Sequence, residues 1–133
     1  MEYFEVNRTE QLPSALERIV ASRPDAFLFL QGPVFYARVS EIAAMALERK
    51  LPSIATIPAW VEREGLLAYY PDTDDILRRT VTYIERILRG AKPADLPVEQ
   101  PTRFRFDINL KTAKAIGLKI PQSVLVQADL VIE

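Results

Sequence analysis

A proline-rich segment constrains the fold more than any other feature of this sequence. Pro93, Pro97 and Pro101 lie between Gly90 and the alternating segment 103–109. Each proline lacks a backbone N–H and fixes φ, so the segment cannot form the interior of a helix or a central strand. We therefore expect a helix to end at Gly90 and an extended arm to follow it. An arm of this kind carries the chain from one packed unit to another.

The rest of the chain alternates between strand patterns and helix patterns. We expect strands at 3–6, 26–30, 52–57, 65–70 and 103–109, and helices at 9–22, 34–50, 72–89, 109–117 and after Pro121, with a loop or one helical turn at 58–64. The continuous apolar run 26–30 is typical of a strand buried on both faces. This order predicts an α/β fold with a parallel, doubly wound, three-layer sheet of the flavodoxin or Rossmann type, in one domain of residues 1–133.

The composition excludes several classes of function. The 133 residues include no Cys and no His, which removes zinc sites built from those residues, Ser-His-Asp triads and Cys-His nucleophiles. The net charge of −1, with acids and bases interspersed, predicts no nucleic-acid partner. Residues 1–5 lack the basic and apolar regions of a signal peptide. We expect no catalytic residue, no metal and no cofactor.

Ligands of parallel α/β sheets bind beyond the carboxyl ends of the strands. Three loop segments, 31–36, 56–60 and 69–72, fall there and carry aromatic and small residues suited to a partly apolar ligand. The candidate ligand-binding residues are Gly32, Pro33, Val34, Phe35, Pro58, Trp60, Tyr69 and Tyr70. The alternative is that these residues only anchor loops to the core. The acidic run 72–75 is better explained as charge at a helix N-terminus than as a metal site.

A resemblance to a known family rests on residues 89–102 (RGAKPADLPVEQPT), Phe106 and residues 108–121 (INLKTAKAIGLKIP). These segments resemble the C-terminal signature of ABC-transporter substrate-binding proteins of the type I periplasmic-binding fold, in the tryptophan/tyrosine-binding-like branch. Two positions differ from the family, because Glu64 and Tyr70 stand where its members usually have glycine.

The resemblance implies that the chain is a single C-terminal lobe of a longer, two-lobed protein that binds a small-molecule solute, such as an amino acid, and works with an ABC permease. It implies that residues 74–102 are a crossover helix and a hinge return, and that the helix belongs to the other lobe. Members of the family are periplasmic or extracytoplasmic. Without the other lobe the apolar stripe of the helix has no cover, so we expect a homodimer, with residues 74–90 exchanged between protomers as one form of it.

Three functions remain open at this point. The first is solute binding by a lone or truncated lobe. The second is a dimerising structural or interaction module that binds no small molecule. The third, a flavodoxin-like enzyme, is the least favoured, because the sequence shows no phosphate-binding loop and no His.

Overall fold

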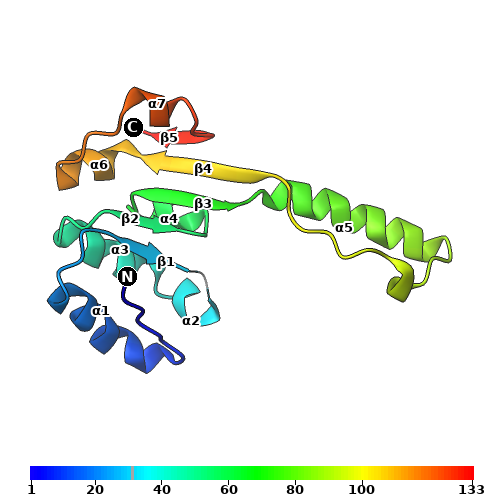
Figure 1. Cartoon of the computed structure of the whole chain (residues 1–133), viewed down its shortest axis with the longest axis horizontal. Coiled ribbons are helices and arrows are strands. Elements are labelled where there is room, and N and C mark those ends of the chain that lie inside the picture. The colour runs from blue at the N-terminus through cyan, green and yellow to red at the C-terminus, as the bar shows by residue number, and fades with distance from the viewer. Residues whose placement is uncertain (31) are drawn as a thin grey trace. The chain divides into compact units, whose positions relative to one another are not determined.

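The computed structural model describes residues 1–30 and 32–133, with only the backbone of Val34, and it divides into two compact units. The first, here called the sheet unit, comprises Met1–Tyr70 and Phe106–Glu133. The second, here called the helical unit, comprises Pro71–Arg105. The chain therefore leaves the sheet unit after Tyr70 and returns to it at Phe106 (Figure 1).

The sheet has five strands in the order β1-β2-β3-β4-β5, which are Phe27–Phe29, Ser53–Ala55, Leu67–Pro71, Phe104–Asn109 and Leu130–Ile132. β1, β2 and β3 are parallel, and β4 is parallel to β5. β4 runs against β3, because the N–H of Asn109 donates to the carbonyl of Leu66 while the N–H of Asp72 donates to that of Arg103. The prediction of an α/β fold with a mainly parallel sheet is confirmed. The reversal at β4 was not predicted, and it follows because the chain returns to the edge from which β3 leaves.

The helices of the sheet unit are the 3-10 helix η1 (Thr9–Gln11), α1 (Leu12–Ala21), α2 (Pro33–Tyr36), α3 (Val39–Glu48), α4 (Ala59–Glu62), α6 (Leu110–Ile116) and α7 (Gln122–Leu125). Two predictions of local structure are wrong. The helix expected at 34–50 is interrupted, because the backbone of Arg38 leaves the helical region between α2 and α3. Residues 3–6, expected as a strand, pair with no strand of the sheet.

The core of the sheet unit lies between the sheet and helices α1, α3 and α4. Trp60 of α4 is fully buried, with its ring 5.2 Å from that of Phe29 and 6.0 Å from that of Phe27. Gly65 allows this packing, since a Cβ at that position would lie 2.3 Å from Nε1 of Trp60. The indole therefore fills the space that any side chain at position 65 would need.

Two polar side chains connect α6 to α4 and to the loop that follows α4. Asn109 caps α6 by accepting a hydrogen bond from the N–H of Thr112 (2.9 Å), and its amide donates to the carbonyl of Val61 (2.8 Å). The hydroxyl of Thr112 donates to the carbonyl of Glu64 (2.9 Å), whose φ is +67°. A left-handed backbone favours glycine, so a glutamate at this position stores strain. Gly117, with φ of +79°, ends α6 as predicted.

The helical unit consists of α5 (Thr73–Leu88) and the arm that follows it, which contains the 3-10 helix η2 (Pro93–Asp95). Asp72 caps α5 by accepting from the N–H groups of Asp74 (3.0 Å) and Asp75 (3.2 Å). Gly90, with φ of +101°, follows the last turn and ends the helix as predicted.

Candidate functional site

The loops after β1 and β2 carry three of the predicted ligand-binding residues at the carboxyl edge of the sheet. Gly32 and Pro33 lie at the start of α2, and Pro58 lies at the start of α4. Pro33 is exposed, whereas Gly32 and Pro58 are half-buried. Val34 follows in α2, but its side chain lies outside the described part of the chain. Gly32, Pro33 and Pro58 therefore lie in the loops that follow two neighbouring strands, β1 and β2.

Phe35 and Trp60 pack into the core. The ring of Phe35 lies 5.2 Å from the ring of Phe29, in an edge-to-face arrangement. Trp60 has no exposed surface, and its Nε1–H has no hydrogen-bond partner among the described residues. Its position lends no support to a role in ligand contact, because a ligand would have to displace the core to reach it. The sequence could not show this, since a tryptophan in a loop or short helix can face either way.

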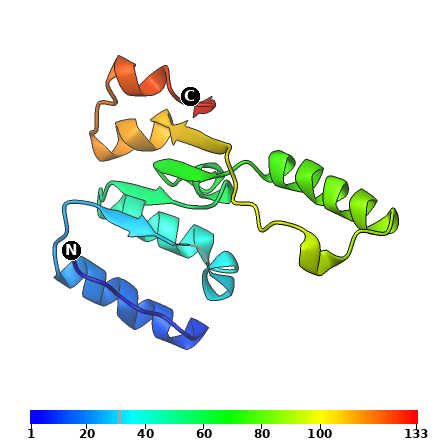
Figure 2. The ribbon, with the colours of Figure 1, turned by 45° about the vertical axis from the view of Figure 1, so that its right-hand side comes forward.

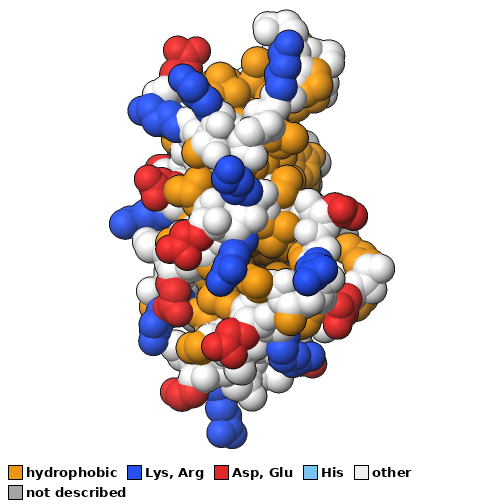
Figure 3. All heavy atoms as spheres, turned by 90° about the vertical axis from the view of Figure 1, so that its left-hand side faces the viewer, with side chains coloured by type: hydrophobic (Ala, Val, Ile, Leu, Met, Phe, Trp, Pro, Cys, Tyr) orange, Lys and Arg blue, Asp and Glu red, His pale blue; other side chains and the backbone are white. Residues whose placement is uncertain are grey.

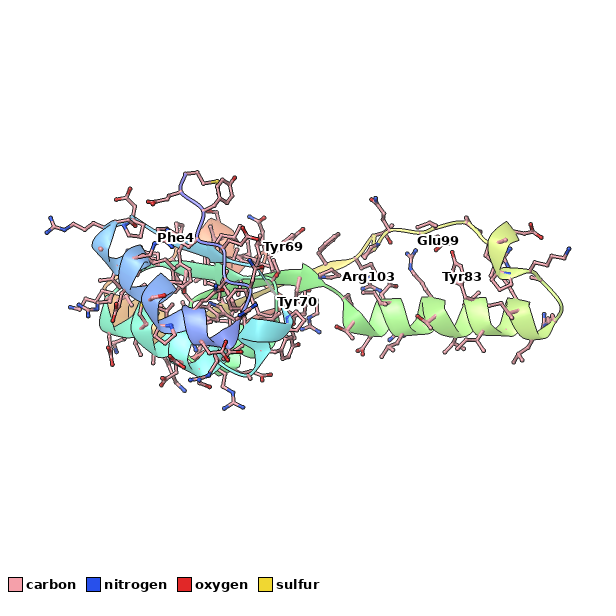
Figure 4. The ribbon with its side chains drawn as sticks, turned by 90° about the horizontal axis from the view of Figure 1, so that it is seen from below. Phe4, Tyr69, Tyr70, Tyr83, Glu99 and Arg103 are labelled. Carbon is pink, nitrogen blue, oxygen red and sulfur yellow. The ribbon has the colours of Figure 1, made fainter. Side chains whose placement is uncertain are left out.

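Tyr69 and Tyr70, adjacent on β3, lie on opposite faces of the sheet (Figure 4). Tyr69 is 49% exposed, and its ring lies 6.5 Å from that of Phe106 on β4. Tyr70 is buried, and its hydroxyl donates a 2.6 Å hydrogen bond to the carboxylate of Asp107. Of the two, only Tyr69 presents an aromatic surface to solvent. Phe106, which sequence reasoning did not assign to the site, extends that surface; the antiparallel register of β3 and β4 places it there.

Each unit contains a groove in its described residues. The first, here called the arm groove, has a volume of about 490 Å³ and lies between α5 and the arm. The second, here called the edge groove, has a volume of about 720 Å³ and lies between residues 1–6, α1 and β1. Phe35 lines the edge groove, whereas Gly32, Pro33, Pro58, Trp60, Tyr69 and Tyr70 line neither. The predicted ligand-binding residues other than Phe35 are therefore separate from the lining of these two grooves.

Polar contacts hold the arm against α5 inside the helical unit. Arg79 donates to Asp75 on its own helix (2.9 Å), and to Glu99 (3.1 Å) and Thr102 (2.5 Å) on the arm. These carboxylates, Asp75 first, raise the pKa of the guanidinium, so Arg79 stays charged. Tyr83 projects from α5 toward the arm and donates to the carbonyl of Pro97 (2.5 Å; Figure 4).

Within the helical unit, the pKa of Tyr83 is raised and that of Asp72 is lowered. Loss of hydration, and then the nearby carboxylate of Glu99, raise the pKa of the Tyr83 phenol above its ordinary 10.0. The backbone N–H of Asp75 lowers the pKa of Asp72 below 3.8. Desolvation opposes this effect, and the backbone N–H of Asp74 adds to it. At neutral pH the cap of α5 is therefore ionised and the phenol that binds the arm is neutral.

One face of α5 is apolar and exposed. Leu77, Val81, Ile84 and Leu88 recur at intervals of four and three residues and are 58%, 64%, 51% and 82% exposed. The neighbouring face, with Ile76, Tyr83 and Ile87, lines the arm groove. No helix in the described part of the chain is long and apolar enough to cross a membrane. An apolar face of this kind is typical of a protein contact surface.

Charge and metal ligands give no sign of another kind of site. On the face drawn in Figure 3, acidic and basic side chains alternate with apolar ones and form no patch of a single sign. Within residues 1–30 and 32–133, no three carboxylates or other metal-binding side chains cluster closely enough to hold an ion.

Comparisons with known proteins identify the family of the chain. Residues 1–132 match a family model described as ABC transporter substrate binding protein. The ABC domain in complex with L-Trp from Streptococcus pneumonia is 31% identical, with a TM-score of 0.87 over 98% of this chain and 44% of that chain. A conserved domain protein from Vibrio cholerae is 25% identical, with a TM-score of 0.84 over 95% of this chain and 42% of that one.

A third solved structure shares the fold. It is the ligand-free, open form of a substrate-binding protein with adhesive properties from Clostridium difficile, 19% identical with a TM-score of 0.68 over 96% of this chain and 42% of that chain. A search among curated proteins gave no match. The chain spans less than half the length of these three structures. Because the family model covers nearly all of its residues, the chain belongs to the ABC transporter substrate-binding protein family.

Proposed function

We propose that the sheet unit forms one wall of a cleft that binds a small solute, such as an amino acid with an apolar or aromatic side chain, for uptake by an ABC transporter. The observation that carries the proposal is the match over 98% of the chain, at 31% identity, to a domain solved in complex with L-Trp. The contacts on this wall are the ring of Tyr69 and the loop edge formed by Gly32, Pro33 and Pro58. Trp60 and Tyr70 support that wall from within the core.

The proposal places the second wall of the cleft outside these 133 residues. The matched domain has more than half of its length outside the match, which supports a partner lobe of comparable size. The apolar face of α5 fits the same view, since burial against that lobe would remove four half-exposed side chains from water. At about half of 1.5–3 kcal/mol each, their burial would contribute about 3–6 kcal/mol.

A lone wall buries at most about half of the ligand, so we expect the isolated chain to bind weakly. Titration of L-Trp, L-Tyr, L-Phe and L-Lys, followed by amide NMR shifts, tests this. Binding near 1 mM, about −4 kcal/mol, is expected for the aromatic ligands, with the shifts centred on Gly32 and Tyr69. Tyr69→Ala should abolish these shifts. Tyr3→Ala removes an aromatic residue that is 80% exposed and serves as the matched control.

Two outcomes would contradict a solute-binding role. One is the absence of any shift with the whole panel at millimolar concentration. The other is an equal loss of binding in Tyr69→Ala and Tyr3→Ala, which would show that the ligands contact exposed rings at random.

The second candidate is a structural module that dimerises through α5 and binds no small molecule. It is favoured by the same exposed face, Leu77 to Leu88, which a second copy of the chain would also cover. In this candidate, exchange of residues 74–90 between protomers is one way to bury the stripe. A dimeric mass together with a negative titration would support it over the first proposal.

A further inference from the structure

The outer edge of β1 has no strand beside it. The N–H of Phe27 donates to Pro52 (3.0 Å) and the carbonyl of Phe29 accepts from Thr56 (3.3 Å), so both residues turn their backbone toward β2. Successive residues of a strand point their backbone groups to opposite sides, so those of Leu28 face away from β2. Within the described part of the chain, no backbone bond reaches Leu28 from that side. The N–H and the carbonyl of Leu28 are thus an open donor and acceptor at the edge of the sheet, where another strand can pair.

Residues 3–6 alternate between exposed and half-buried side chains, as in a strand, but they pair with no strand of the sheet. Phe4 and Val6 are half-buried, whereas Tyr3 and Glu5 are exposed. Phe4 is held at α1, with the guanidinium of Arg18 5.2 Å from the centre of its ring. Figures 1 and 2 both draw this segment along α1. Residues 3–6 therefore offer a second backbone edge that is available for pairing with a neighbouring strand.

The edge groove lies between these two backbone edges. Its volume is about 720 Å³, and Leu16 and Ile19 of α1 and Ile42 of α3 contribute to its apolar lining. The groove therefore combines two backbone edges with a surface that would bury apolar side chains. A small apolar molecule would bury the apolar lining but would not pair with the backbone of both edges.

We propose that the edge groove is the seat of an extended, apolar polypeptide strand supplied from outside these 133 residues. The strand would pair with Leu28 on one side and with residues 3–6 on the other, and its side chains would cover Leu16 and Ile19. Its entry would turn residues 3–6 into a strand and extend the sheet beyond β1. The length of the matched domain that lies outside the match, more than half, supports a polypeptide source for the strand.

Two other occupants fit the groove less well. A second copy could not insert its own β1, because residues 1–6 of that copy lie beside the edge that would have to enter. Movement of residues 3–6 onto β1 would satisfy the edge, but it would break the contact of Phe4 with Arg18 of α1. An added strand would form hydrogen bonds with both backbone edges and bury the apolar lining at the same time, as in β-augmentation.

The test uses the full chain and an acetylated, amidated peptide of sequence Lys-Thr-Val-Ile-Val-Thr-Lys. The control peptide has the same sequence with N-methyl groups on both Val residues, which keeps the apolar surface but removes backbone donors. Hydrogen exchange should show that the first peptide protects the amides of Leu28 and of residues 4–6 together. The N-methylated peptide should bind at least ten-fold more weakly.

Two variants localise the effect on the protein. Leu28→Lys places a charge on the strand edge, at a residue already 47% exposed, and should weaken the first peptide ten-fold or more. Tyr36→Lys, at a residue 59% exposed that does not line the groove, should leave its binding unchanged. Circular dichroism of both variants shows whether the fold is retained.

Four results would overturn the proposal. Equal affinity for the two peptides would show that the groove binds apolar side chains without strand pairing. Protection of Leu28 alone, without residues 4–6, would show that the peptide only adds outside the groove. Full protection of both walls before peptide is added would mean that residues 3–6 already close the edge. A doubling of mass that blocks the peptide would assign the groove to a second copy.

Discussion

Substitution of Gly65 by alanine should destabilise the sheet unit by steric conflict with Trp60. The new Cβ would lie 2.3 Å from Nε1 and 2.4 Å from Cδ1 and Cε2 of the indole. The indole cannot move aside freely, because it is fully buried against Phe27 and Phe29. Overpacking of a close-packed core costs about 1–3 kcal/mol, and a clash with three ring atoms belongs at the upper end. We expect a loss of about 3 kcal/mol, or roughly 10 °C in Tm for a chain of this size.

The assay can use Trp60 itself, because it is the single tryptophan of the chain. In the native protein its fluorescence should be blue-shifted and resistant to quenching by acrylamide. In Gly65→Ala the emission should shift to longer wavelength, and urea unfolding followed by circular dichroism should give the loss of stability. Gly117→Ala is the matched control, since a Cβ there meets nothing within 4 Å and only the φ of +79° disfavours it, at about 1–2 kcal/mol.

A double-mutant cycle identifies the cause of the loss. Trp60→Leu removes the ring, so the added cost of Gly65→Ala in that background should fall by about 1–3 kcal/mol, while the cost of Gly117→Ala should not change. A Gly65→Ala variant within 0.5 kcal/mol of the parent, or an unchanged cost in the Trp60→Leu background, would refute the reasoning. Ready quenching of the native protein would show instead that Trp60 reaches the surface, as the sequence suggested.

Three further predictions concern the rim of the core and the helical unit. Glu64→Gly should raise the free energy of unfolding by up to about 1 kcal/mol in a urea titration, because it relieves a φ of +67°; a loss of stability would contradict this. The N–H of Asp75 lowers the pKa of Asp72 below 3.8, so the ionised cap should stabilise α5 above about pH 4, and helicity should fall as the pH drops through the lowered pKa. Asp72→Asn should flatten this pH dependence of helicity, measured by circular dichroism, and an unaltered profile would argue against it. If α5 joins two copies, Val81→Glu should reduce a dimeric mass in light scattering to that of one chain, and a parent protein that is already monomeric at micromolar concentration would exclude the dimer.

The sequence predicted best the features that depend on neighbouring residues. Gly90 and Gly117 end their helices where expected, because a left-handed residue after the last turn is a local requirement. The Asn109 cap and the prolines of the arm are local signals of the same kind. The family signature also lies in this part of the chain, so the sequence alone indicates the family.

Features that depend on register or on a missing neighbour were not predictable in the same way. The parallel order of β1 to β3 follows from the strand-helix alternation, but the direction of β4 depends on where the chain returns from the helical unit. Of the adjacent tyrosines Tyr69 and Tyr70, the sequence could not tell which would face solvent. Residues 3–6 have the pattern of a strand, yet a strand forms only where another backbone lies beside it. The sequence could therefore name the loops of a candidate site, but not which of their side chains face solvent.

The opposite directions of β3 and β4 make the helical unit, in topological terms, the loop of a β-hairpin. Tyr69 and Phe106 are cross-strand neighbours, and the ladder still holds at Asp72 and Arg103. The whole excursion between those two residues could therefore be replaced by a two-residue Asn-Gly turn, which suits the twist of antiparallel strands. Such a minimal protein would keep the sheet, the candidate ligand wall and the edge groove, and would lose the arm groove together with the exposed apolar face of α5.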